Sequence, residues 1–266
     1  MLTGIIKKLV HEGYDVSRGM DITLRSDIQK ESDIGFTSAV LLNMLSLLLK
    51  QNGVSLSSEK QVRYVLHVEK ETLGSLATPT EPVTMLNKKA GSLLFIDQFN
   101  DDVKQVPFDF DKYALLLLDT NRSPELSMNS IVKRMKQIDK GYEAINAKRS
   151  IETLGDLDIQ KFNQFKPFIT SPLVMKRVEH VIFENDRAKQ GVEVINNHEY
   201  PLLGELFTQS HTSLKELLEV SCEELDYIVN DLIKMEALGA KMTGLGFGGC
   251  VVALFEKSAV PDSQPL

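Results

Sequence analysis

The stretch Lys241-Met-Thr-Gly-Leu-Gly-Phe-Gly-Gly-Cys-Val-Val-Ala-Leu254 is the most distinctive part of the sequence. Four glycines fall in six consecutive positions, 244–249. Glycine permits positive φ and close backbone approach, which suits a loop that wraps phosphate or sugar oxygens. A tight connection between a helix and a strand explains the same glycines and stays open as the alternative. The residues predicted to contact a ligand here are Thr243, Gly244, Gly246, Gly248 and Gly249.

The same loop contains the spacing G-x-G-x-x-G. A dinucleotide-binding fingerprint with this spacing requires a strand before the loop and a helix after it. The sequence predicts the opposite order, with a helix over 222–238 before the loop and a strand over 250–256 after it. A Rossmann-type interpretation is therefore excluded.

Hydrophobic periodicity and breaker residues predict the remaining elements. Four consecutive leucines in 113–119 indicate a strand that is buried on both faces. Pro79 and Pro82 predict a break at 78–82. Short strands mixed with long helices, without regular βαβ alternation, favour an α+β fold. The further helices are expected over 2–11, 38–50, 58–71, 129–146, 172–196 and 201–210, and the further strands over 20–24 and 92–97.

The composition is that of a folded chain, with 42% hydrophobic residues among 266 and a net charge of −7. An acidic chain is a poor candidate for binding nucleic acid. The most apolar segment, 39–49, is a predicted core helix and is too short for a bilayer, which needs roughly 20 residues. Two cysteines, Cys222 and Cys250, are too few for a disulfide framework, and we expect both to be buried thiols. With no secretory signal at the start, we expect a cytoplasmic protein without membrane or nucleic-acid partners.

Several stretches resemble the galactokinases, which are members of the GHMP small-molecule kinases. Residues 241–254 resemble the family's C-terminal glycine motif, and 177–187 its helix R-x-x-H-x-x-x-E-N-x-R. Residues 210–226 resemble its segment S-H-x-S-L-R-D-D-Y-x-V-S-x-x-E-L-D. Residues 93–97 and 119–121 resemble its middle strands.

The resemblance implies a GHMP-type α+β fold in two parts and a reaction. Residues 1–122 would form an incomplete N-terminal domain, like domain 2 of ribosomal protein S5, and 123–266 an α+β C-terminal domain. The family transfers the γ-phosphoryl group of ATP to galactose, giving galactose 1-phosphate, with the help of Mg²⁺. The family's opening motif, G-R-V-N-L-I-G-E-H-T-D-Y, is expected to be absent because Met1 aligns downstream of it.

The family's phosphate loop, P-x-G-x-G-L-S-S-S-A, corresponds to residues 29–39. Glu31 and Asp33 are aligned with its two glycines and place negative charge where phosphates approach backbone N–H groups. A partial hydroxyl cluster persists at Gly35, Thr37 and Ser38. The substitutions predict a disabled phosphate loop.

Two further family positions are altered. The catalytic aspartate of G-I-M-D-Q corresponds to Glu81, whose extra methylene displaces the carboxylate by about 1 Å and can cost roughly 100-fold in rate. The alternative for Glu81 is an exposed loop glutamate without a role. The sugar-contacting tyrosine of Y-N-x-R-R corresponds to Ile131, which cannot hydrogen-bond a sugar hydroxyl.

Other polar residues are predicted to be structural. His180 and Glu184 lie four apart on one helix face without a third ligand, which indicates a surface pair and not a metal site. His211, expected just after a helix end, resembles a structural position of the family. Cys250 begins a predicted buried strand and is expected to be packed and unreactive.

Three functions stay open at this point. The first is a galactokinase-like enzyme of low rate or changed substrate that uses Glu81 and the loop 243–249. The second is a non-catalytic pseudokinase that binds a small ligand or a protein partner, or associates with itself through an exposed sheet edge. The third is the product of a truncated gene. The altered positions predict weak or absent catalysis.

Overall fold

The computed structural model describes residues 1–16, 19–28, 34–98, 100 and 102–261. These residues form two units, of which the first ends at Gln105 and the second begins at Val106. Each unit mixes helices with a small sheet, so the predicted α+β class is confirmed. The division into family domains at 122/123 stays a prediction.

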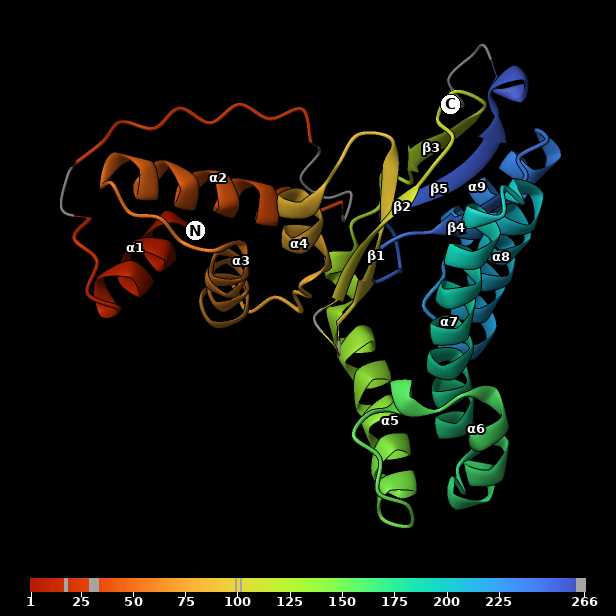
Figure 1. Ribbon diagram of the computed structural model, residues 1–266. Coiled ribbons are helices and arrows are strands. Elements are labelled where there is room, and N and C mark those ends of the chain that lie inside the picture. The colour runs from red at the N-terminus through yellow and green to blue at the C-terminus, as the bar shows by residue number, and fades with distance from the viewer. Residues whose placement is uncertain (17–18, 29–33, 99, 101, 262–266) are drawn as a thin grey trace. The chain divides into compact units, whose positions relative to one another are not determined.

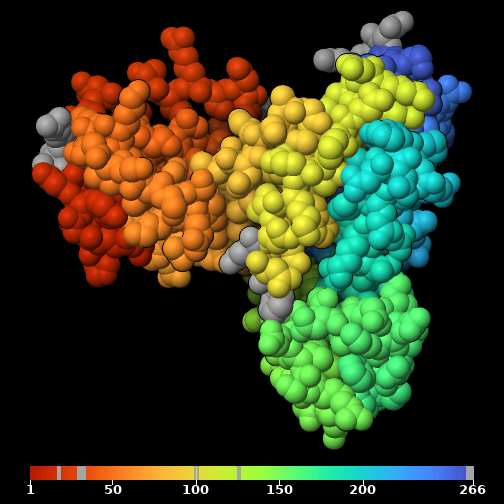
Figure 2. Space-filling view, viewed as in Figure 1, coloured from red at the N-terminus to blue at the C-terminus, as the bar shows by residue number. Residues whose placement is uncertain are grey.

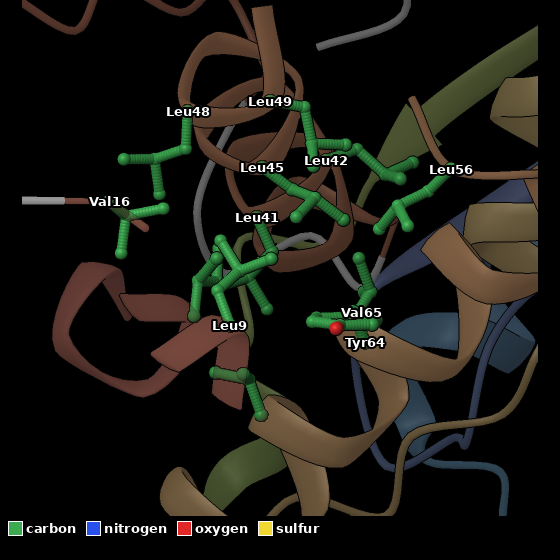
Figure 3. Close-up of a cluster of buried hydrophobic side chains, with 12 residues drawn as sticks. Leu9, Val16, Leu41, Leu42, Leu45, Leu48, Leu49, Leu56, Tyr64 and Val65 are labelled. Carbon is green, nitrogen blue, oxygen red and sulfur yellow. The ribbon is translucent and has the colours of Figure 1, made fainter. Parts of the chain in front are cut away.

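The first unit is built around helix α2 (Phe36–Gln51). Its leucines pack against α1 (Leu2–His11) and α3 (Ser58–His67), and Figure 3 shows their side chains in the core. Figure 1 shows the arrangement of the three helices. Ser57 caps α3 by accepting a hydrogen bond from the Lys60 N–H at 3.3 Å. The predicted helix at 2–11 and the predicted core helix at 39–49 are both confirmed.

Helix α3 continues into a single π-helical turn, Val68–Thr72, and a further helix α4 (Thr80–Asn87) follows. The sequence predicted only a break at 78–82, and this was wrong. Pro82 lies in the first turn of α4, where backbone N–H groups have no intrahelical partner and a proline is tolerated. Strands β1 (Ser92–Asp97) and β2 (Asp102–Pro107) pair next, the first as predicted.

The strand predicted at 20–24 is absent from the structure, which has no regular element there. Its residues alternate in hydrophobicity, but Leu24 is exposed. A strand also requires a hydrogen-bonded neighbour, and among the described residues none pairs with this segment.

The second unit contains an antiparallel sheet in the order β3-β5-β4. Strands β3 (Tyr113–Asp119) and β5 (Cys250–Glu256) have the predicted bounds. Strand β4 (Gly239–Met242) was missed, because the helix predicted to reach 238 ends at Lys234 as α9 (Glu223–Lys234).

Burial on both faces belongs to the central strand β5 and not to β3, which corrects the expectation from the four leucines. Leu116 and Leu118 of β3 pack into the core, whereas Leu117 is 50% exposed. Strand β3 lies at an edge of the three-stranded order and has one packed face.

Helices α8 (Tyr200–Ser213) and α9 pack on this sheet. Helix α7 (Pro172–Asn196) packs on α8 and on α5 (Met128–Asn146), and α6 (Ile159–Phe165) lies against α7. Figure 2 shows the side chains of α5 and α6, in green, closely packed. The helices predicted over 129–146, 172–196 and 201–210 are confirmed. None of the helices described is both long and apolar enough to cross a membrane.

Candidate functional site

The start of helix α2 holds a small cluster of oxygen atoms. Gly35 caps the helix in the left-handed conformation, with φ of 85°. One turn later the Ser38 hydroxyl donates a 2.7 Å hydrogen bond to Oε1 of Glu69 in the π-helical turn. Both side chains are buried. The cluster therefore joins a residue predicted from the phosphate loop to a carboxylate that the sequence analysis did not single out.

Glu81 lies next to this cluster. A Cβ atom built on Gly35 would lie 3.2 Å from Cγ of Glu81, so the two residues are in contact. The Glu81 carboxylate also accepts a 3.3 Å hydrogen bond from the Thr78 hydroxyl. Glu81 is half-buried in the first turn of α4, which corrects its alternative interpretation as an exposed loop glutamate.

The buried Glu69 carboxylate is electrostatically unusual. Burial raises its pKa, the Ser38 hydrogen bond opposes that rise, and the nearby charge of Glu81 adds to it. Its second oxygen, Oε2, is buried and has no hydrogen-bond partner among the described residues. An unpartnered carboxylate oxygen beside a hydroxyl and a second carboxylate is a hard-oxygen donor set.

This donor set fits Mg²⁺, which is bound through one or two carboxylates together with waters and substrate phosphates. A cage of three or more protein ligands is not required, and within the described ranges no three His, Cys, Asp or Glu side chains are grouped to hold a metal ion. One signal in the sequence points to Glu69. It follows Val62 and Val65 at helical spacing, so it falls on the buried face of this helix, where a charged residue is unusual.

The other residues predicted from the phosphate loop are less informative. Thr37 is half-buried in the first turn of α2. Glu31 and Asp33 lie outside the described residues. The structure thus brings Gly35, Ser38 and Glu81 together in the first unit, while the glycine loop belongs to the second.

The glycine loop connects β4 to β5 and so lies between two strands. The predicted alternative, a connection from a helix to a strand, was wrong in this respect, although the exclusion of a Rossmann fold stands. Several N–H groups of the loop already donate hydrogen bonds within the protein. That of Thr243 donates to the Cys250 carbonyl at 2.8 Å, that of Phe247 to the Val220 carbonyl at 2.7 Å, and that of Gly249 to the Arg122 carbonyl at 2.9 Å. The Thr243 hydroxyl donates to the Cys250 carbonyl at 3.1 Å.

Close backbone contact explains two of the loop glycines. A Cβ atom on Gly246, with φ of 90°, would lie 2.3 Å from the Val220 oxygen. A Cβ atom on Gly248, with φ of 150°, would lie 2.2 Å from the Arg122 oxygen. These glycines are required by packing within the second unit. Contact of the loop with a ligand stays a prediction.

The helix motif at 177–187 forms a buried polar network. Arg177 is fully buried and donates from Nε to the Gln137 side chain at 3.0 Å, and from its terminal nitrogens to the Leu217 carbonyl and to the Glu219 carboxylate. It thereby ties α7 to α5 and to the π-helical turn after α8.

His180 and Glu184 belong to the same network, and the expected surface pair was wrong. His180 is buried, with Nδ1 2.9 Å from the Ser213 hydroxyl, and burial lowers its pKa to about 4. Glu184 accepts hydrogen bonds from Arg187 and from the Ser210 hydroxyl. The two side chains join α7 to α8 because each has its own partner there.

His211 lies within α8 and not after its end, and it has a structural environment. Its Nδ1 accepts a hydrogen bond from the Met242 N–H at 3.4 Å, which leaves Nε2 as the donor to Asp226, 3.2 Å away. Burial lowers the His211 pKa, while the Asp226 charge opposes that shift. Cys250 is buried in β5 as predicted, and Ile131 is buried in α5.

Comparison with known proteins agrees with these motifs. Residues 192–263 match the family "GHMP kinases C terminal". Galactokinase from Clostridium tetani is 30% identical over 258 residues, which are 96% of this chain and 65% of that protein. Galactokinase from Ligilactobacillus salivarius is 29% identical over 97% of this chain and 67% of that protein. The chain is similar to galactokinases along nearly its whole length, and to the GHMP kinases in its C-terminal part.

The fold of this chain is also similar to that of solved structures. The crystal structure of Lactococcus lactis galactokinase complexed with galactose aligns with a TM-score of 0.92 at 24% identity, over 97% of this chain and 67% of that one. A mevalonate kinase aligns with a TM-score of 0.62 at 21% identity, over 96% of this chain and 68% of that one. The chain spans about two thirds of the length of these relatives.

Proposed function

We propose that this chain is a slow galactokinase-type phosphotransferase, which transfers the γ-phosphoryl group of ATP to galactose. The observation that carries the proposal is the cluster of Ser38, Glu69 and Glu81 beside the cap of α2. A buried carboxylate with an unpartnered oxygen destabilises the fold unless a ligand uses it. The proposed place of action is the cytoplasm.

Each cluster residue has a distinct role in this proposal. Oε2 of Glu69 and the Ser38 hydroxyl would hold Mg²⁺, which when bound offsets the negative charge of the phosphate oxygens. The Glu81 carboxylate accepts the proton of the attacking sugar hydroxyl. Gly35 provides space for Glu81, because a Cβ atom there would crowd its side chain.

The low rate follows from the altered positions. A glutamate replaces the aspartate that the resemblance implies, and its carboxylate is displaced by about 1 Å. Ile131, at the position of the sugar tyrosine, is apolar and 4% exposed, so it offers no hydrogen bond to a sugar. Both changes weaken positioning, on which phosphoryl transfer depends.

The test is formation of galactose 1-phosphate from radiolabelled ATP, compared between the wild-type chain and Glu81→Gln. We expect slow product formation that falls at least about 100-fold in the variant. Glu59→Gln, at an exposed glutamate of the same unit, is the matched control and should keep the wild-type rate. Equal rates in all three chains, or no product from a folded wild-type chain, would contradict the proposal.

The inactive alternative, a pseudokinase that binds ligand without turnover, has its own readout. Thermal unfolding with and without MgATP reports binding whether or not phosphate is transferred, because a ligand at 100 times its dissociation constant adds about 2.7 kcal/mol to stability. A shift without product would favour the pseudokinase.

A further inference from the structure

A cavity of about 490 Å³ lies between α1 and α3 in the first unit. Its lining comes from Lys8 of α1, from Glu12 just after that helix, and from one side of α3 and the π-helical turn. This volume is in the range of sites for small ligands, roughly 300–1,000 Å³. None of the residues predicted to carry the family's chemistry lines it.

The α3 side of the cavity carries a regular row of basic side chains. Lys60, Arg63, His67 and Lys70 follow one another at intervals of three, four and three residues, so they share one helix face. All four are exposed. At 1.5 Å per residue, the row from Lys60 to Lys70 is about 15 Å long.

The charges in the lining do not cancel. Four Lys and Arg side chains face two carboxylates, those of Glu12 and Glu71, which leaves two positive charges with His67 neutral. The Glu12 carboxylate is already engaged, by Lys8 at 3.0 Å and by the Tyr64 hydroxyl at 2.6 Å. The excess is notable in a chain whose net charge is −7.

The two ends of the basic row are available to a ligand. Arg63 pairs with Glu59 at 3.0 Å, but among the described residues Lys60 and Lys70 have no ion-pair partner. A single phosphate group cannot reach both lysines, because they are separated by about 15 Å along the helix. A ligand that carries several phosphate groups can contact the row at more than one point.

We propose that this cavity binds a small molecule that carries two or more phosphate groups. The row supplies charge-assisted hydrogen bonds, which are stronger than neutral ones. The limited volume favours a small anion over a nucleic acid strand. The site is separate from the Ser38 cluster, since Glu69 is buried and faces Ser38, whereas Lys70, its neighbour, is exposed and lines the cavity.

The test is calorimetric titration of the whole chain with sodium tripolyphosphate, without Mg²⁺ and at fixed ionic strength. We expect the double variant Lys60→Gln/Lys70→Gln to bind at least about tenfold more weakly than the wild type. The matched control is Lys88→Gln/Lys89→Gln, which removes the same charge from exposed positions outside the cavity and should bind as the wild type does. If both double variants bind tripolyphosphate equally weakly, the loss of affinity comes from the lower overall charge of the chain and the proposal is overturned.

Two further titrations distinguish binding in this cavity from binding at the phosphate loop and from binding of a single phosphate group. Ser38→Ala should leave the affinity for tripolyphosphate unchanged. If Ser38→Ala loses binding while Lys60→Gln/Lys70→Gln keeps it, the anion binds at the phosphate loop and the proposal is wrong. Inorganic phosphate should bind more weakly than tripolyphosphate, and equal affinities would contradict a ligand with several phosphate groups. Thermal unfolding of each variant without ligand shows that the surface substitutions leave the fold intact.

Discussion

The Ser38 hydroxyl donates a 2.7 Å hydrogen bond to the Glu69 carboxylate, 31 residues away in sequence. Both side chains are buried, and they connect the first turn of α2 to the π-helical turn after α3. One hydrogen bond satisfies only part of a carboxylate, which has two oxygens to satisfy. The burial of the Glu69 carboxylate with one unpartnered oxygen therefore destabilises the fold, and this points to a role in binding.

Glu69→Gln should stabilise the chain above pH 4.5 and abolish its response to Mg²⁺. Burial raises the Glu69 pKa above its unfolded value, so the folded state holds the proton more tightly. The stabilising effect of that proton is complete below the unfolded pKa and is lost as pH rises through the folded pKa. Glutamine does not titrate, so the advantage of the variant should grow as pH rises.

Urea unfolding midpoints of the two chains at several pH values between 4 and 8 would measure this. Glu59→Gln, which removes an exposed carboxylate of α3, should show no such growth with pH. A difference in stability between Glu69→Gln and the wild type that stays constant or shrinks as pH rises would refute the assignment of Glu69 as a buried acid with a raised pKa.

Glu81→Asp should accelerate phosphoryl transfer, by up to about 100-fold, if the extra methylene is what limits the rate. The measurement is kcat for galactose under saturating MgATP. The gain is expected in kcat and not in KM, because the base acts in the transition state.

Glu59→Asp is the control for a general effect of shortening a glutamate and should leave kcat unchanged. A lower kcat in Glu81→Asp than in the wild type would contradict the prediction. It would show that the backbone around Pro79 and Pro82 positions a glutamate carboxylate better than an aspartate carboxylate.

Strong periodic patterns predicted the fold well, and breaker residues predicted it poorly. The apolar run 250–256 matched β5 because a strand buried on both faces needs a continuous apolar sequence. The run 113–119 matched the bounds of β3, although that strand has only one packed face. The helix α4 was missed because a proline in the first turn of a helix looks the same in sequence as a proline that ends one. Strand β4 is four residues long and too short for its pattern to stand out from the helix before it.

The candidate site was only partly predictable, for a different reason. Gly35, Ser38 and Glu81 could be found one at a time from the family's motifs. Glu69 stands out in sequence only as a charged residue on an apolar helix face, because its contact with Ser38, 31 positions earlier, is visible only in the structure. His180 likewise resembles a surface residue in sequence, since the partner that buries it belongs to another helix.

Gly246→Ala should destabilise the fold by about 2 kcal/mol or more, through the left-handed backbone and the clash with the Val220 oxygen. Gly191→Ala, in the C-terminal part of α7, is the matched control. Its added methyl group would meet only Leu203, at 3.9 Å, and alanine favours the helix by about 1 kcal/mol. Chemical denaturation should therefore give opposite signs for the two variants. A tolerated Gly246→Ala would contradict the conclusion that close packing against Val220 requires this glycine.

His180 should make the fold sensitive to mild acid. Burial, with the charges of Lys241 and Arg187 adding to it, lowers the His180 pKa from 6.5 to about 4. Between pH 6.5 and pH 4 the unfolded chain therefore binds a proton that the folded chain does not bind. The free energy of unfolding falls by about 3 kcal/mol as pH falls across that range.

His180→Gln removes this dependence while keeping a polar group near Ser213. The wild-type advantage over the variant should thus shrink by this amount from pH 7 to pH 4, as measured by urea unfolding at each pH. His211 is present in both chains and cancels in the comparison. A constant difference between them would show that folding leaves the pKa of His180 unchanged, and would contradict the prediction.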